Sequence, residues 1–549
     1  MRKTLLCLLI LFTLNVSGQE SKNHNLEVAK QIELFSTIYR YLDMMYVDTL
    51  NAKEVIEAGI NGMLQSLDPY TEYYPPTDRK ELKSMITGKY GGIGAIVSYR
   101  VKDGYSVISE PYLGMPADEA GLKKGDAILA IDGEDMKGKK LNYVTEHLRG
   151  DAGSSFMLKY LRPGQKKPQT VKITRRQIQT PAIPFYGMAN DSIGYINLNQ
   201  FTEDCSKGMR NAIIDLKRKG MKSLILDLRG NTGGSLSEAV EILNLFVPKD
   251  IDLVKTQGKI KQANHVYKTT KLPIDTIMPI VTLVGSITAS ASEITCGTLQ
   301  DLDRGVVMGT KTFGKGLVQT PFDLPYNANV KITTGHYYIP SGRCVQAVKF
   351  KRGGNEVVAD SLKREFKTLH GRTVKDGGGI MPDIEVKPDT IPNIVYYLNS
   401  GADSTSVMLD YVVDYVSKHD TIAPAKNFII SDEDYEEFKK RAIEAGFQYD
   451  RESSKLLKKL REVAEFEGYY NRAKTEFDAL EKKLAHDLCI ELDYHRNAVK
   501  EAITADIVTC YYYQAGGIEN SLQFDKLFNE AMKLLADKKR YHYILQNKE

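Results

Sequence analysis

The sequence has few cysteines, and none of them belongs to a paired metal-binding or redox motif. Six cysteines are spread over 549 residues without a Cys-x-x-Cys pair. A His-Glu-x-x-His motif is also missing, so we expect no metal site and no cofactor. The cysteines that follow Cys7 are scattered and odd in number. We interpret them as buried thiols, with at most one or two disulfides.

An excess of charge of one sign and a long internal apolar run are missing as well. The chain has 74 lysines and arginines against 70 aspartates and glutamates, a formal net charge of +4. This balance gives no indication of nucleic acid as a partner. No stretch beyond the N-terminus approaches the roughly 18 apolar residues of a membrane span. The length favours about three or four domains, and we expect a soluble mature protein.

The N-terminus has the pattern of a signal peptide. Arg2 and Lys3 precede an apolar run over residues 5–14, and small residues follow at 16–18. We therefore predict a signal peptide over residues 1–18, cleaved after Gly18, and an exported protein of the periplasm or cell envelope. Cys7 lies too early in the run for a lipid-modified cysteine at the cleavage site. A retained membrane anchor is the alternative.

The next two segments differ in their periodicity. Apolar residues follow helical spacing between residues 26 and 67, which predicts a helical N-terminal region over residues 19–84. Residues 85–175 alternate β-like runs with glycine turns, and a short helix at 116–121 leads through Gly-Asp into a strand at 127–131. This run, followed by Asp-Gly, resembles the most recognisable stretch of PDZ domains.

The rest of the chain divides into an α/β part and a helical part. Strands alternate with helices over residues 176–390, which favours a largely parallel sheet. Residues 391–549 predict amphipathic helices, whose apolar stripes serve core or partner-helix packing. The stripes are Leu456, Leu460 and Val463, then Phe477, Leu480, Leu484 and Leu488.

Three motifs stand out in the α/β part. They are Asp-Leu-Arg-Gly-Asn-Thr-Gly-Gly at 227–234, Ser-Ala-Ser-Glu-Ile at 290–294 and Thr-Phe-Gly-Lys-Gly-Leu-Val-Gln at 312–319. In this order, with flanking matches at 67–71 and 379–383, they resemble the C-terminal processing peptidases. The resemblance covers about residues 26 to 386. It implies a PDZ-like β-rich domain ahead of an α/β peptidase core of the tail-specific protease (ClpP/crotonase-like) type. Together with the two helical regions, this predicts a multidomain α/β protein with a helical N-terminal segment and a helical C-terminal extension, and the family does not by itself explain that extension.

The resemblance implies a Ser-Lys dyad. It maps the nucleophile to Ser290, the general base to Lys315 and a supporting glutamine to Gln319. A serine hydroxyl needs a nearby base to accept its proton. The nine histidines lie outside the three motifs, and no Gly-x-Ser-x-Gly elbow is present. A lysine can take this role if burial keeps it neutral. If the lysine segment is a strand, Gln319 shares a face with Lys315. Ser292 is the rival nucleophile.

Attack on a carbonyl also needs an oxyanion hole. The resemblance places its donors at the backbone N–H groups of Ala291 and Gly234, and glycine permits the close approach that a substrate needs. A tight strand-to-helix turn is the alternative interpretation. Asp227 and Arg229 are expected to brace this turn by a charge-assisted hydrogen bond.

One motif imitates a phosphate-binding loop. Residues 309–315 satisfy most of the Walker pattern, but Gly316 supplies no hydroxyl for magnesium and Pro321 follows where a long helix should begin. Nucleotide binding is therefore not expected.

The family resemblance implies cleavage of envelope proteins near their C-termini. The PDZ domain would take an extended peptide by strand addition and hold its carboxylate in a backbone nest at Gly92, Ile93 and Gly94. Its partners are proteins or peptides with free C-termini. A catalytically inactive PDZ-bearing adaptor or scaffold is the alternative. Self-association or adaptor binding through the C-terminal helices stays open.

Overall fold

The computed structural model describes residues 2–351, 354–399, 405–449, 452–484 and 487–546, with only the backbone for the first 22. The chain forms two compact units. One consists of residues 1–75, 321–332 and 350–354, and the other holds all remaining residues.

The smaller unit is largely helical. It contains α1 (Arg2–Met45), α2 (Ala52–Gln65) and β1 (Glu72–Tyr74), which pairs antiparallel with the first residues of β18 (Asn329–Tyr338). The helical prediction for this part is confirmed. The predicted signal peptide falls where no side chains are described, so it stays a prediction. Among the described residues, none of the helices is both long and apolar enough to cross a membrane.

Residues 79–179 form a six-stranded β-sheet, a separate two-stranded sheet of β2 and β9, and three short helices. The strand order of the larger, PDZ-like sheet is β3-β4-β5-β7-β8, with β6 paired to β5, so β3 is an edge strand. The predicted strand at 127–131 is β5, and the predicted short helix is α4. The elements are α3 (Arg79–Thr87), β2 (Lys89–Gly92), β3 (Ala95–Arg100), β4 (Tyr105–Pro111), α4 (Pro116–Glu119), β5 (Ala127–Ile131), β6 (Glu134–Asp135), α5 (Leu141–Leu148), β7 (Ser155–Leu161), β8 (Gln169–Thr174) and β9 (Arg176–Gln179).

A six-stranded sheet forms the centre of the α/β part. Its order is β10-β11-β12-β15-β16-β23, and all neighbours except β10 and β11 run parallel. Every residue of β12 and β15 is buried, as expected for a sheet covered on both faces. The elements are β10 (Phe185–Met188), β11 (Ile193–Asn197), α6 (Cys205–Arg218), β12 (Ser223–Asp227), α7 (Leu236–Leu243), β15 (Ile280–Val284), α8 (Ala291–Asp301), β16 (Val306–Gly309) and β23 (Ile384–Glu385).

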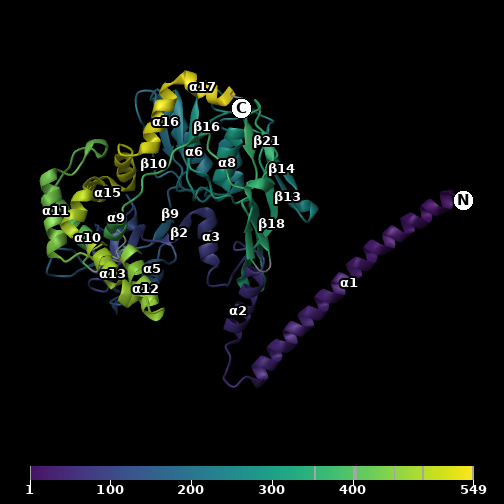
Figure 1. The fold of residues 1–549 in the computed structure, drawn as a ribbon, viewed down its shortest axis with the longest axis horizontal. Helices are drawn as coiled ribbons and strands as arrows, with labels where there is room; N and C mark the ends of the chain where they lie inside the picture. The colour runs from purple at the N-terminus through teal and green to yellow at the C-terminus, as the bar shows by residue number, and fades with distance from the viewer. Residues whose placement is uncertain (1, 352–353, 400–404, 450–451, 485–486, 547–549) are drawn as a thin grey trace. The chain divides into compact units, whose positions relative to one another are not determined.

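Helices from distant parts of the sequence cover the two faces of this sheet. One core cluster joins it to α6, α7 and α8. The other joins it to α16 (Lys526–Ala536) and α17 (Lys538–Gln546), drawn in yellow beside β16 in Figure 1. Tyr541 of α17 is buried, and its hydroxyl bonds both the N–H and the carbonyl of Ile280 at 2.9 and 3.0 Å. The last helices of the chain thus complete the central α/β layer.

Smaller strands flank the central sheet. Within the larger unit, β13 pairs with the second half of β18, and β17 also pairs with β18. The elements are β13 (Asp252–Gly258), β14 (His265–Lys268), β17 (Leu317–Asp323), β19 (Val348–Lys351), β20 (Gly354–Val357), β21 (Glu365–Lys367) and β22 (Thr373–Lys375).

Seven helices remain in the described C-terminal part, and all of them except α12 and α13 share a core of their own. They are α9 (Asn393–Asn399), α10 (Val407–Lys418), α11 (Asp432–Glu444), α12 (Glu452–Phe466), α13 (Tyr470–Leu484), α14 (Leu488–Tyr494) and α15 (Arg496–Ser521). The helical prediction for this part is confirmed. The stripe residues Leu456, Leu460 and Val463 lie exposed on α12 rather than in this core.

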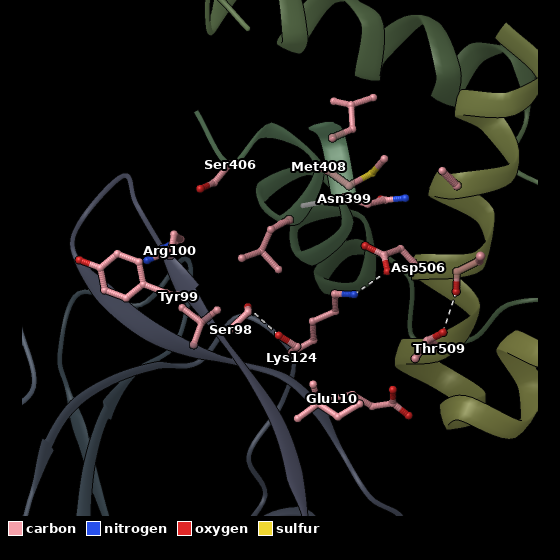
Figure 2. A pocket seen from close by; sticks show the side chains of 17 residues that line it. Ser98, Tyr99, Arg100, Glu110, Lys124, Asn399, Ser406, Met408, Asp506 and Thr509 are labelled. Carbon is pink, nitrogen blue, oxygen red and sulfur yellow. Dashed lines mark hydrogen bonds and ion pairs between the residues drawn. The ribbon is translucent and has the colours of Figure 1, made fainter. Parts of the chain in front are cut away.

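Helices α9, α10 and α15 face the PDZ-like sheet around a cavity of about 400 Å³, shown in Figure 2. Lys124 beside this cavity pairs with Asp506 of α15 at 2.7 Å. Burial acts to lower the pKa of Lys124, but Asp506 outweighs it, so the pKa lies above its usual value. Tyr513, where α15 breaks with a φ of 56°, donates to Asp118 at 2.9 Å. The helical region is therefore attached to the PDZ-like segment by polar contacts.

Candidate active site

A glycine turn follows the central strand β12. The chain passes from Asp227 through residues 228–235 into α7, with φ of 103° at Gly233 and 140° at Gly234. A Cβ on Gly234 would lie 2.4 Å from the carbonyl oxygen of Phe201. Both the backbone angle and the contact therefore require glycine at this position.

The neighbouring strand β15 leads into the loop that ends at Ser290. Ser290 has φ 56° and ψ −118°, which is a strained conformation for a residue with a side chain. It is the N-cap of α8, so Ala291 is the first helical residue. The N–H of a first helical residue has no acceptor within the helix. The serine thus lies at a sharp strand-to-helix turn, beside an N–H group that can serve a ligand.

Polar contacts join this loop to the glycine turn. The Thr288 hydroxyl donates to the carbonyl of Leu228 at 2.8 Å, and the N–H of Ala289 donates to the carbonyl of Asn231 at 3.2 Å. The Asn231 side chain in turn accepts from the N–H of Gly233 at 2.8 Å. The two predicted motifs therefore form one hydrogen-bonded assembly.

The Ser292 side chain is part of that hydrogen-bonded assembly. Its hydroxyl is buried and donates to the carbonyl of Asn231 at 3.0 Å. Ser290, by contrast, is only partly buried.

A buried carboxylate connects the serine loop with the lysine motif. Glu293 is fully buried, and four donors converge on it. Its Oε2 accepts from the backbone N–H groups of Ser290 at 2.9 Å and Lys315 at 2.8 Å. Its Oε1 accepts from the Thr312 hydroxyl at 2.6 Å and the Gly314 N–H at 2.7 Å. One side chain thus fixes the backbone of both predicted dyad residues.

The four donors are what permit this burial. Burial raises the pKa of the Glu293 carboxyl above its usual value, and the hydrogen bonds from Thr312, Lys315, Gly314 and Ser290 oppose this rise without cancelling it. A carboxylate that accepts several N–H bonds is favoured in its charged form.

The lysine segment is irregular rather than extended. Strand β17 begins at Leu317, so the condition that Lys315 lies on one strand with Gln319 is not met. The physical reason is that Gly314, with φ 89°, and the contacts to Glu293 hold the preceding residues in a loop. Gln319 does lie on β17, where its amide donates to Thr333 at 3.3 Å.

The predicted brace of the glycine turn is present. Arg229 donates through Nε to Asp227 at 3.0 Å and through Nη2 at 2.6 Å. Asp227 also accepts from the hydroxyl of Tyr195 at 2.8 Å.

The PDZ candidate residues lie where β2 leaves its ladder. Gly92 pairs with Arg176, and Ile93 is buried, with its carbonyl accepting from Ala117 at 2.8 Å. Gly94 has φ 69°, and the edge strand β3 begins immediately afterwards.

No metal-binding group was found in the described parts of the chain: no three His, Cys, Asp or Glu residues there are arranged to hold a metal ion. The five cysteines from Cys205 to Cys510 are all free thiols. Two are buried and the others are partly exposed, so the prediction of buried thiols holds only for Cys205 and Cys296.

Two contacts of the site were not predicted from the sequence. Glu293 has a local signal, because a glutamate three residues after an N-cap serine is a capping-box pattern. Tyr337, whose buried hydroxyl donates to the carbonyl of Ser290 at 3.3 Å, comes from β18 and has no such signal.

Comparisons with known proteins match three parts of the chain. The model for Peptidase family S41 matches residues 192–352, and that for a PDZ domain matches residues 107–162. The model described as Probable PDZ-protease, C-terminal helical domain matches residues 394–535. A carboxy-terminal-processing protease of Bartonella bacilliformis is 35% identical over 331 residues, 59% of this chain and 75% of the relative. The chain belongs to peptidase family S41.

Two further proteins are similar to this chain. The carboxy-terminal processing protease CtpB of Bacillus subtilis is 32% identical over 319 residues, 58% of this chain and 66% of the relative. A solved photosystem II D1 C-terminal processing protease matches 65% of this chain and 94% of its own, with 27% identity and a TM-score of 0.36.

Family membership confirms the predicted enzyme class. The chain is a serine endopeptidase of the C-terminal processing type with a PDZ domain, which implies peptide binding. Nothing in these comparisons supports the inactive adaptor. The predicted domain boundaries and site residues stay predictions.

The carboxylate of Glu293 should be essential for turnover. In Glu293→Gln the amide NH₂ replaces one oxygen and faces a backbone N–H in either orientation, that of Gly314 or those of Ser290 and Lys315, so the backbone of at least one of the two loops must shift. We expect kcat to fall on the order of 10²-fold, because small misplacements of reacting groups cost about this much. The measurement is peptide cleavage, with circular dichroism to check folding.

Glu241→Gln is the matched control. Its carboxylate lies on α7 in an exposed ion pair with Lys271. Native kcat in the Glu293 variant would contradict the role assigned to its carboxylate.

Proposed function

We propose that this S41 peptidase is an exported enzyme that cuts envelope proteins near their C-termini, with Ser290 as nucleophile and Lys315 as general base. The observation that carries the dyad is the shared acceptor Glu293, which binds the N–H groups of both residues. The strained backbone at Ser290 adds to it, because such strain clusters at active sites.

The reaction follows from these roles. Lys315, when neutral, takes the proton of the Ser290 hydroxyl as its oxygen attacks the peptide carbonyl carbon. The N–H groups of Ala291 and Gly234 stabilise the oxyanion. Lys315 then returns the proton to the leaving amine as the C–N bond breaks, and water hydrolyses the acyl-enzyme by the same steps. Gln319 supports the lysine loop from β17.

Substrate selection is assigned to the PDZ domain. Strand β3 is the edge of its sheet, and an extended peptide can add to such an edge with alternate side chains pointing into pockets. The left-handed Gly94 and the neighbouring Gly92 and Ile93 form the proposed nest for the terminal carboxylate.

Export rests on the N-terminal pattern. A signal peptide cleaved after Gly18 is supported by Arg2 and Lys3, the apolar run at 5–14 and the small residues before position 19.

The C-terminal helices are the proposed surface for adaptor binding or self-association. This is supported by the exposed Leu456, Leu460 and Val463 of α12.

Ser290→Ala should abolish cleavage. Loss of the nucleophile of a serine peptidase costs on the order of 10⁴- to 10⁶-fold in kcat. Ser292→Ala is the matched control and should cost much less, because its hydroxyl only bonds a backbone carbonyl. An active Ser290 variant beside an inactive Ser292 variant would reverse the assignment.

Lys315→Arg should also be inactive. The guanidinium keeps its charge, with a pKa above about 12, and cannot accept a proton from serine. Steady-state cleavage assays across pH 5 to 9 test the same role, since wild-type activity should rise with pH. Near-native turnover in the arginine variant would rule out the dyad.

A free substrate C-terminus should increase kcat/KM. Amidation removes the negative charge on which the N–H dipoles of a nest converge. The measurement compares free and amidated peptides long enough to reach both the PDZ domain and Ser290. A ratio near one would defeat the claim that this PDZ domain binds C-termini.

A further inference from the structure

The second carboxylate on Arg229 comes from the far end of the chain. Asp525 Oδ2 lies 2.5 Å from Arg229 Nη2. Asp525 belongs to the region matched by the C-terminal helical domain, almost 300 residues beyond the turn that it contacts. None of the three catalytic motifs contains it.

Asp525 is held in place by its own helix. It is the N-cap of α16, where its Oδ1 accepts from the N–H of Phe528 at 3.0 Å. Leu527 and Phe528 then pack into the core on the central sheet. The carboxylate is thus presented by a rigid element, with one oxygen for the helix and the other for Arg229.

Arg229 lies between two acids. Its guanidinium is 2.6 Å from Asp227 on one side and 2.5 Å from Asp525 on the other. Burial acts to lower the pKa of Arg229, but the two carboxylates outweigh this and raise it, so the side chain stays charged. The Asp227 side chain is almost fully buried and that of Asp525 is 16% exposed, so water screens these pairs less than surface pairs.

The position of Arg229 matters for the serine loop. Its N–H donates to Asp227 at 3.0 Å, so side chain and backbone close one small ring at the start of the glycine turn. The adjoining carbonyl of Leu228 accepts the Thr288 hydroxyl two residues before Ser290. A shift of Arg229 would therefore move both the turn that holds Gly234 and the loop that holds Ser290.

We propose that Asp525 is a positioning residue of the active site, through which the C-terminal helical region fixes Arg229 and the glycine turn. This rests on the proposed function, in which Gly234 donates to the oxyanion. Asp525 touches no reacting atom and acts only through Arg229.

Asp525→Asn tests the charge without removing the cap. Asparagine is as good an N-cap as aspartate, so α16 should remain in place. We expect kcat to fall on the order of 10-fold with KM little changed, because the misplaced donor acts in the transition state.

Asp487→Asn is the matched control in the full-length protein. Asp487 is the N-cap of α14, and its carboxylate binds only the N–H groups of Cys489 and Ile490 in the described contacts. Both substitutions remove the charge of an N-cap aspartate, and only Asp525→Asn should lower kcat.

Two results would overturn the proposal: native kcat and KM in Asp525→Asn, or a rise in KM with kcat unchanged. The outcome is independent of the dyad test. An active Ser290→Ala enzyme would defeat the dyad, whereas the Asp525 effect is measured with Ser290 in place.

Discussion

The site depends on one buried carboxylate. Glu293 carries no partner cation in its immediate hydrogen-bonding set, and four uncharged donors surround it instead. Two of them are the backbone N–H groups of Ser290 and Lys315. A buried charge with all its acceptor positions used is costly to disturb, since any shift leaves a polar group unsatisfied. This requirement ties α8, the serine loop and the lysine loop to a single geometry.

Residues far away in the sequence also support the site from the second face of the central sheet. The central sheet buries both faces, and α16 and α17 supply the cover that α6 to α8 leave open. Asp525, the N-cap of α16, pairs with Arg229 at the start of the glycine turn. The C-terminal helical region therefore contacts two other parts of the protein. Its helices α16 and α17 pack on the central sheet of the peptidase core. Its helix α15 contacts the PDZ domain through Asp506 and Tyr513.

Local signals in the sequence identified many elements and the family. The strand 127–131 was predicted with the bounds that the structure gives, because an apolar run bounded by glycine turns is decided by nearby residues. The lysine motif was the exception. The sequence left open whether its lysine lies on a strand, and hydrogen bonds to Glu293 and the left-handed Gly314 keep Lys315 in a loop.

The sequence by itself therefore determined the family, the order of its regions and the three motifs that carry the candidate site. Tertiary structure alone decided how the motifs meet: Glu293 beneath Ser290 and Lys315, Tyr337 on the serine carbonyl and Asp525 on Arg229. The physical reason is separation along the chain. A contact between residues about 300 positions apart leaves no period or spacing in the sequence, and only the packing of α16 on the central sheet brings them together.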